Sequence, residues 1–262
     1  MRLRSATPAC FVSGFVSGFV SGFISGVFPA LLFFSALPAL AAFEDPTREK
    51  PFLPWIWNEQ IKPTFVRGTD CGGFAILLGT SMATIAAHQY DPDIRADYGD
   101  HARMPAEVSR YGDWIGAGYA SALTSVAGLI WDQPNGLLIS RAVVFTSVSH
   151  FAIATAVNRE RPNHGPYSFP SGHTSTSFAL AGSLAYAYGP LVGVPAIAVA
   201  TFVGASRIAD NAHWFSDTIA AAGLGLFWSR ASAHVKDEVA DYGAWVPALV
   251  PGGFSIAYTK NF

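Results

Sequence analysis

The stretch that decides the fold is SRIADNAHWFSD, residues 206–217, because it places reactive side chains at the junction of two apolar segments. Arg207 closes one apolar segment, and His213 and Asp217 open the next. A spacing of four puts His213 and Asp217 on one face of a helix. A carboxylate there can hold one imidazole N–H and leave the other nitrogen as the better nucleophile. The stretch therefore predicts a polar site where two helices meet.

Two further polar blocks interrupt the apolar second half of the chain, NRERP at 158–162 and SFPSGHTS at 168–175. Arg161 in the first block and Arg207 are planar cations whose geometry suits phosphate oxygens. Each block alone is weak evidence, because a Pro-Ser-Gly-His run can also be a helix N-cap. The order and spacing of all three blocks in one chain favour a shared anion site.

The second block supplies backbone donors and a second imidazole. Ser171 and Gly172 stand just before an apolar helix, so their N–H groups can point at an anion from its N-terminus. His173 follows directly. Two histidines beside a phosphate divide into one that attacks and one that protonates the leaving oxygen. We interpret the remaining histidines as structural or surface residues, with His164 a candidate for the rim of the site: His88, His101, His150, His164 and His234.

Apolar segments of helical length fill the middle of the chain. A net charge of −2 and a charged fraction of 13% argue against a nucleic-acid-binding protein and against disorder. We therefore expect an all-α helical bundle in one domain at 73–236. Its helices are predicted at 73–90, 114–131, 137–158, 174–188, 190–206 and 214–229.

The flanking segments differ from this bundle. Residues 42–72 are rich in Pro, Trp and charge, which predicts an irregular segment. The segment 237–262 ends in GGFSIAYTKNF, where Phe254, Ile256 and Tyr258 alternate with smaller or polar residues. This alternation predicts a short, β-like C-terminal tail.

The first 41 residues follow the order of a secretory signal peptide, with two early arginines, a long apolar stretch and the small-residue exit ALA. Within them, FVSGFVSGFVSGFISG repeats a four-residue unit at residues 11–26. The glycine spacing also suits packed membrane helices, and the apolar length would suit an uncleaved anchor. We favour the signal peptide, because a leader needs only bulk hydrophobicity.

Together the three blocks resemble the signature motifs of the type 2 phosphatidic acid phosphatase superfamily, which includes lipid phosphatases, bacterial non-specific acid phosphatases and vanadium haloperoxidases. The first motif is met in part, by Arg161 and Pro162. The second and third are met in full, by Pro170, Ser171, Gly172 and His173 and by Ser206, Arg207, His213 and Asp217.

The resemblance implies a phosphoric monoester hydrolase that forms a phosphohistidine and needs no metal or other cofactor. In it, His213 would be the nucleophile, Asp217 would orient His213, and His173 would protonate the leaving alcohol. The phosphate-binding groups would be Arg161, Arg207, Ser171, Gly172 and Ser206. The expected substrate is a phosphorylated small molecule or a lipid headgroup, and the residues carry no signal for an oligomeric state.

One position departs from the family pattern. The family's lysine, seven residues before the motif arginine, is Ala154 here. Losing one donor from a preorganised oxyanion site costs about 3 kcal/mol, or roughly a hundredfold in rate. We therefore expect a weaker phosphatase or one with a substituted donor. On a continuous helix, Asn158 lies closer than Arg159 to the face of position 154.

Two alternatives stay open beside the phosphatase. One is a vanadate-dependent haloperoxidase, in which the cradle would hold vanadate. The other is a catalytically impaired relative with a binding or structural role.

Counting membrane crossings bears on location. If the segments 73–90, 114–131 and 137–158 all crossed a membrane after an exported Phe43, the block at 158–162 would face the cytoplasm. Bacterial lipid phosphatases of this superfamily generally face the periplasm. The segments are also short and carry polar residues. We therefore favour an exported periplasmic protein, soluble or membrane-associated, over an integral membrane protein.

Overall fold

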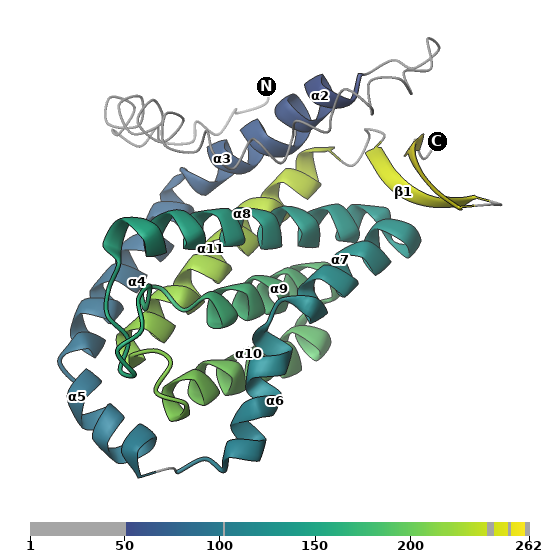
Figure 1. Ribbon diagram of the computed structural model, residues 1–262. Helices are drawn as coiled ribbons and strands as arrows, with labels where there is room; N and C mark the ends of the chain where they lie inside the picture. Colours follow the sequence, from purple (N-terminus) through teal and green to yellow (C-terminus); the bar gives the residue numbers. More distant parts are fainter. Residues whose placement is uncertain (1–50, 102, 240–243, 251–252, 260–262) are drawn as a thin grey trace. The chain divides into compact units, whose positions relative to one another are not determined.

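The computed structural model describes residues 51–101, 103–239, 244–250 and 253–259. Within these ranges the chain forms the expected helical bundle, together with a two-stranded hairpin (Figure 1). The predicted signal peptide lies outside the described residues. The elements are α2 (Phe52–Trp55), the π-helical η3 (Ile56–Ile61), α3 (Lys62–Gly68), α4 (Cys71–His88), α5 (Asp91–Ile94), the π-helical η4 (Arg95–Asp100), α6 (Ala106–Gly116), α7 (Tyr119–Trp131), α8 (Gln133–Val157), α9 (Gly172–Tyr188), α10 (Pro190–Ala209), α11 (Phe215–Val239), β1 (Ala244–Val250) and β2 (Gly253–Thr259).

The stretch from α2 to α3 is helical rather than irregular, so the expectation for residues 42–72 is wrong over 52–68. Pro63 stands in the first turn of α3, where its missing N–H costs no helical hydrogen bond. Trp55 is buried against Leu129 and Leu137, which anchors the stretch on α7 and α8. Proline content therefore misled the prediction, because these helices are held by packing.

The helix predicted at 114–131 is divided into α6 and α7. Gly118 makes the break, since its φ of 89° lies in the left-handed region that glycine tolerates. As a result α6 is a separate helix that ends just before the break, and it contacts α10 and α9.

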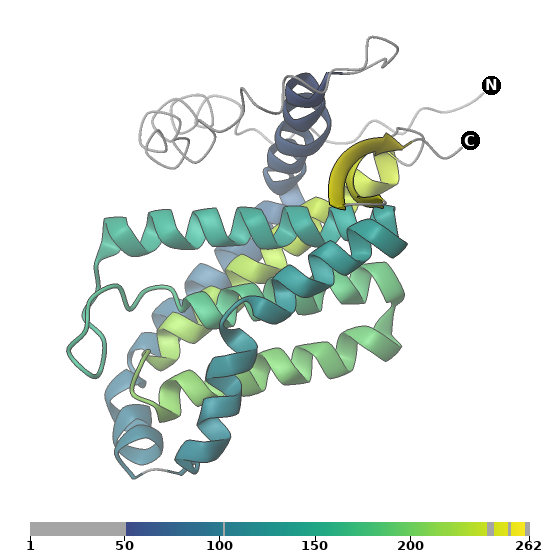
Figure 2. The same cartoon turned by 45° about the vertical axis from the view of Figure 1, so that its right-hand side comes forward.

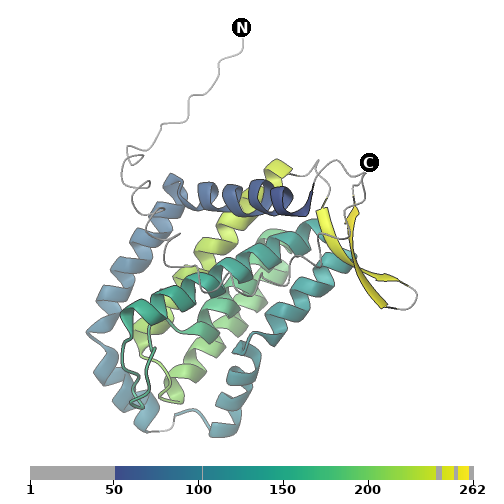
Figure 3. The same ribbon diagram turned by 45° about the horizontal axis from the view of Figure 1, so that its top comes forward.

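Helix α11 lies at the centre of the bundle. It contacts α9, α8, α4 and α3, and Figure 3 shows α3 crossing it near its C-terminal end. Figure 2 shows α8, α9 and α10 as successive layers, and α9 contacts both of the others. Phe227 and Trp228 of α11 pack against Phe65 and Phe145 to form one core cluster.

Small residues let the central helices approach closely. A Cβ added at Gly182 of α9 would lie 2.3 Å from Ser229 Oγ of α11. One added at Gly225 of α11 would lie 2.5 Å from the carbonyl oxygen of Ser175. Close backbone approach through small side chains is a common packing mode of membrane helices.

Three helices of the described residues are long and apolar enough to cross a membrane: α4, α8 and α10. Each exposes large apolar side chains, and the exposed fractions reach 74% for Ile85, 68% for Phe151 and 90% for Leu191. Such surfaces are costly in water and favourable in lipid. The structure therefore favours a membrane protein, the alternative to the largely soluble protein that we expected.

The C-terminal strand expected from the alternation at 254–258 is present as β2. It pairs antiparallel with β1, which the sequence pattern did not predict. Pro247 lies inside β1 and weakened the strand signal there.

The close approach of α9 and α11 gives a stability test. Gly182→Ala should destabilise the protein by about 1–3 kcal/mol, because its methyl group would overlap Ser229. Gly79→Ala is the matched control on α4, where an added Cβ meets no atom within 4 Å. The measurement is unfolding of each detergent-purified variant. Equal stability of the two variants would contradict the packing of α9 on α11.

Candidate active site

Four helix ends converge on the polar blocks. Helix α8 ends before the first block, α9 begins within the second, and the third connects α10 to α11. His173 lies within electrostatic range of Arg161, Arg207 and His213. The structure thus brings the three motifs together at one end of the bundle.

His213 is buried, and its orientation is set by a backbone carbonyl. Its Nδ1 lies 2.7 Å from the carbonyl oxygen of Ser168 and 3.8 Å from Asp217 Oδ2. A carbonyl can only accept, so Nδ1 carries the proton and Nε2 keeps its lone pair. The imidazole of His213 is therefore too far from the Asp217 carboxylate for the expected hydrogen bond, although it lies within ion-pair distance. Its Nδ1–H donates to the carbonyl oxygen of Ser168 instead.

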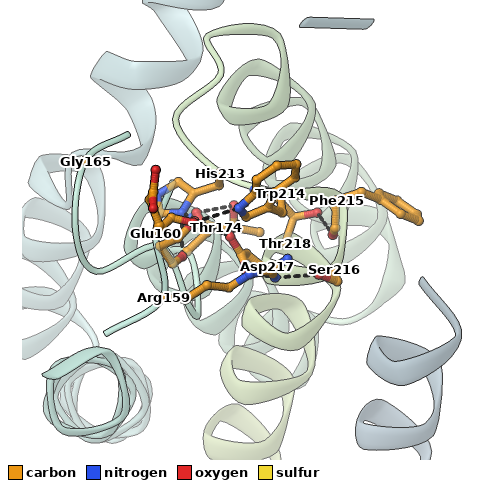
Figure 4. Close-up of polar contacts among 12 residues, drawn as sticks. Arg159, Glu160, Gly165, Thr174, His213, Trp214, Phe215, Ser216, Asp217 and Thr218 are labelled. Atoms are coloured by element: carbon orange, nitrogen blue, oxygen red, sulfur yellow. Dashed lines mark hydrogen bonds and ion pairs between the residues drawn. The ribbon is translucent and has the colours of Figure 1, made fainter. Parts of the chain in front are cut away.

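Asp217 is fully buried and organises the loops around His213 (Figure 4). Its Oδ2 accepts from the Ser168 hydroxyl and from the Trp214 N–H at 2.9 Å. Its Oδ1 accepts from Arg159 Nη1 at 2.6 Å. Because Asp217 holds the side chain of Ser168, whose carbonyl holds His213, the carboxylate positions the imidazole indirectly.

Arg159 connects Asp217 to a second buried carboxylate, Asp91 at the start of α5. Its Nη2 lies 2.8 Å from Asp91 Oδ2, and its Nη1 donates to Ser216 Oγ at 2.8 Å. Asp91 also accepts from the backbone N–H of Ser216 at 2.8 Å. Burial alone would raise the pKa of Asp91, but hydrogen bonds from Ser216, Arg159 and His88 outweigh it and lower that pKa.

Sequence reasoning missed these roles of Arg159 and Asp91. Asn158 ends α8 with a φ of 45°, so the spacing of a continuous helix does not apply to Arg159. Asp91 lies 125 residues from Ser216 and carries no local signal for the contact.

The arginines differ in how their charges are balanced. Arg207 is buried, binds Asp113 and Asp210, and donates to the carbonyl oxygen of Ser109 at 3.3 Å. In the part of the chain that the structure describes, Arg161 has no carboxylate partner, and its Nε is buried without a hydrogen bond. Of the three arginines Arg159, Arg161 and Arg207, Arg161 is therefore the one with unused donor capacity.

Asp113 of α6 bridges two of the predicted site residues. Its Oδ1 lies 3.2 Å from His173 Nε2 and also binds Arg207. The sequence held no signal for this contact, because α6 lies far from both motifs along the chain.

The second motif caps α9. Ser171 is buried and accepts from the Thr174 hydroxyl at 3.0 Å and from its N–H at 3.5 Å. Within the described ranges, no hydrogen-bond partner is recorded for the N–H groups of Gly172 and His173. These N–H groups lie in the first turn of α9, at the positive end of the helix dipole, where an anion binds favourably.

Ser206 plays a different part from the other predicted phosphate-binding residues. Its hydroxyl donates to the carbonyl oxygen of Val203 at 2.7 Å and accepts from Arg207 Nε at 3.2 Å. Its hydroxyl is thus committed to holding Arg207.

The lowered pKa of Asp91 gives a pH-dependent stability prediction. A carboxyl whose folded-state pKa lies below 3.8 stabilises the protein above that pH, and the contribution disappears as the pH falls through the folded-state value. Asp91→Asn should lower the unfolding free energy by roughly 3 kcal/mol at pH 7, because Arg159 loses a buried partner. The difference from wild type should shrink below pH 3.8.

The matched control is Asp93→Asn, since Asp93 is an exposed neighbour on the same helix. Unfolding of the three proteins at neutral and acid pH provides the measurement. A constant difference across the pH range would show that the carboxylate charge of Asp91 does not stabilise the fold.

Known proteins are similar to this chain over the stretch that carries the motifs. Residues 135–240 match the model of the PAP2 superfamily. A lipid A 1-phosphatase from Porphyromonas gingivalis is 36% identical over 100 residues, which cover 36% of this chain and 20% of that protein. A lipid A 1-phosphatase from Rhizobium johnstonii is 31% identical over 137 residues, which cover 45% of this chain and 56% of that protein. The matched stretch thus spans little more than half of the second relative and less of the first.

A solved structure shares the fold. The transmembrane PAP2 type phosphatidylglycerolphosphate phosphatase from Bacillus subtilis aligns with 63% of this chain and 96% of its own, with a TM-score of 0.55 and 21% identity. The family match and this fold confirm the resemblance seen in the three motifs. Residues 135–240, which carry all three motifs, are thus similar to the type 2 phosphatidic acid phosphatase (PAP2) superfamily.

Proposed function

We propose that this protein is an integral membrane phosphatase that removes the phosphate from a lipid phosphomonoester. The observation that carries the proposal is the pairing of an imidazole nitrogen with unused anion donors. His213 keeps a free lone pair on Nε2, while Arg161 and the first turn of α9 hold donors without partners. A phosphoryl group would satisfy those donors and present its phosphorus to the imidazole.

The residues divide the reaction into two displacements. His213 Nε2 attacks phosphorus, the P–O bond to the alcohol breaks, and His173 gives its proton to the leaving oxygen. His173 then takes a proton from the water that attacks the phosphohistidine, and inorganic phosphate leaves. Asp113, at 3.2 Å from His173 Nε2, holds that imidazole in place.

Charge on the transferring group is stabilised by the protein alone in this proposal. Arg161, Arg207 and the N–H groups of Gly172 and His173 surround the phosphoryl oxygens, where the charge lies in the transition state. Because Asp113 and Asp210 already balance Arg207, Arg161 supplies most of the uncompensated positive charge. The proposal therefore includes no metal ion.

Two observations support a lipid substrate. The relatives from Porphyromonas gingivalis and Rhizobium johnstonii are lipid A 1-phosphatases. The helices that carry the site expose apolar side chains along α4, α8 and α10, which suits a site at a membrane surface. A phosphorylated glycolipid such as lipid A is accordingly the first substrate to assay.

We also propose that the catalytic end of the bundle faces the periplasm. The C-terminal end of α4 is joined to the site by Asp91, so the start of α4 lies at the opposite end of this helix. A periplasmic site then puts Cys71, the first residue of α4, on the cytoplasmic side. An exported segment just before α4 would reverse this orientation.

Activity provides the first test. Wild-type protein should release phosphate from lipid A 1-phosphate faster than from a soluble phosphomonoester, and His213→Ala should lower the rate by several orders of magnitude. His101→Ala is the matched control, because His101 is exposed and lies outside the three motifs. Equal rates for His213→Ala and wild type would overturn the phosphohistidine route.

Thiol labelling tests the orientation. Cys10→Ser leaves Cys71 as the one cysteine of the chain, and its side chain is exposed. Because the proposed orientation puts Cys71 on the cytoplasmic side, a membrane-impermeant maleimide should not label it in intact cells. Asn163→Cys, at an exposed position in the loop between α8 and α9, should react with it. The reverse pattern would place the site in the cytoplasm.

A further inference from the structure

His150 lies beside the anion donors, although the sequence placed it among the structural histidines. We propose that His150 is a further phosphate-binding residue, which donates an N–H to the phosphoryl group from α8. The inference rests on the proposed function and extends it to a group outside the three motifs.

The position of His150 on α8 aims it at the same side as Ala154. The two residues are four apart, so they share one face of the helix. Ala154 is buried and offers no polar side chain to the site. His150 is the polar side chain one turn earlier on that face, and it is long enough to reach the second motif.

Gly172 makes room for the imidazole. A Cβ added at Gly172 would lie 2.8 Å from His150 Nε2 and 3.0 Å from its Cε1. The ring therefore lies directly against the backbone that begins α9, and it also hydrogen-bonds to the backbone of Pro170. This places an imidazole donor next to the free N–H of Gly172, where an anion would bind.

The recorded acceptor of His150 is the backbone of Pro170, and no carboxylate among the described residues is recorded as acting on the ring. The groups that act on it electrostatically are His213, His173 and Arg161, none of which is an anion. His150 Nδ1 and Arg161 Nε are both buried and unpaired. Buried donors without partners are costly, and a phosphoryl group bound among them would remove that cost.

The nitrogen of His150 that remains for the phosphoryl group is Nδ1, because it has no hydrogen-bond partner. Nδ1 donates when the ring carries both protons, and a bound phosphoryl dianion favours that charged form. His150 then supplies one donor from α8, where position 154 supplies none.

Kinetics test the role in catalysis. His150→Ala should lower kcat/KM for the lipid phosphomonoester by roughly a hundredfold, as loss of one oxyanion donor does. His150→Gln retains an N–H donor and should lose less. Adding Ala154→Lys to His150→Ala should restore part of the loss, because an amine then enters from the same face of α8. Thr155→Val, at an exposed position on α8, is the matched control.

Binding of inorganic phosphate gives a readout that does not need turnover. Calorimetric titration should show that His150→Ala weakens phosphate binding by about tenfold or more while Thr155→Val leaves it unchanged. Thermal unfolding of each variant checks that the fold is intact, and His150→Gln serves where His150→Ala does not fold.

The outcomes separate the two proposals. Weakened phosphate binding by the His150 variants in a protein that hydrolyses no lipid phosphate supports this inference and removes the proposed function. Loss of hydrolysis in His213→Ala with unchanged binding and kinetics in the His150 variants overturns this inference and keeps the function. A wild type that binds no inorganic phosphate also overturns the inference.

Discussion

The fully buried carboxylate of Asp217 is the interaction on which the site depends. A charge without contact to water is tolerated only where hydrogen bonds replace its hydration. Asp217 takes them from Arg159 after α8, Ser168 before α9 and Trp214 before α11. One carboxylate therefore fixes three segments, and the loop that carries the Ser168 carbonyl to His213 is among them.

The bundle supplies the setting for this carboxylate. Small residues bring α9 and α11 into contact, so the N-terminal ends of both helices can meet at the same polar cluster. The apolar faces of α4, α8 and α10 point outward, which leaves the interior to glycine, serine and a few aromatic side chains. Helix packing that does not rely on a large apolar core suits a protein surrounded by lipid.

The sequence allowed the helices and the motif residues to be predicted because both are local patterns. Apolar periodicity located α9 and α11 to within two residues at their starts, and the Ser-Gly pair marked the N-terminus of α9 correctly. The partners of the motif residues were not predictable in this way. Asp91 and Asp113 reach the site only through tertiary packing of α5 and α6.

The preference for a soluble or membrane-associated protein over an integral membrane protein rested on similar local patterns. Apolar periodicity reports that a residue avoids water, but it does not distinguish a protein core from lipid. Only the exposed fractions of residues such as Ile85 and Leu191 separate the two environments. The short elements from α2 to α3 were missed because their prolines fall where packing and first-turn positions tolerate them.

The distribution of charge explains how one site can hold three arginines near two histidines. Arg159 faces Asp91 and Asp217, and Arg207 faces Asp113 and Asp210, so each of these arginines is matched by two carboxylates. These two arginines connect neighbouring segments, and their charges are already compensated in the absence of substrate. Among the described residues Arg161 has no such match, and it lies within electrostatic range of His150 and His173. A phosphomonoester with two negative charges would neutralise the positive charge that Arg161 leaves uncompensated. A phosphodiester, with one negative charge, would interact with it less strongly.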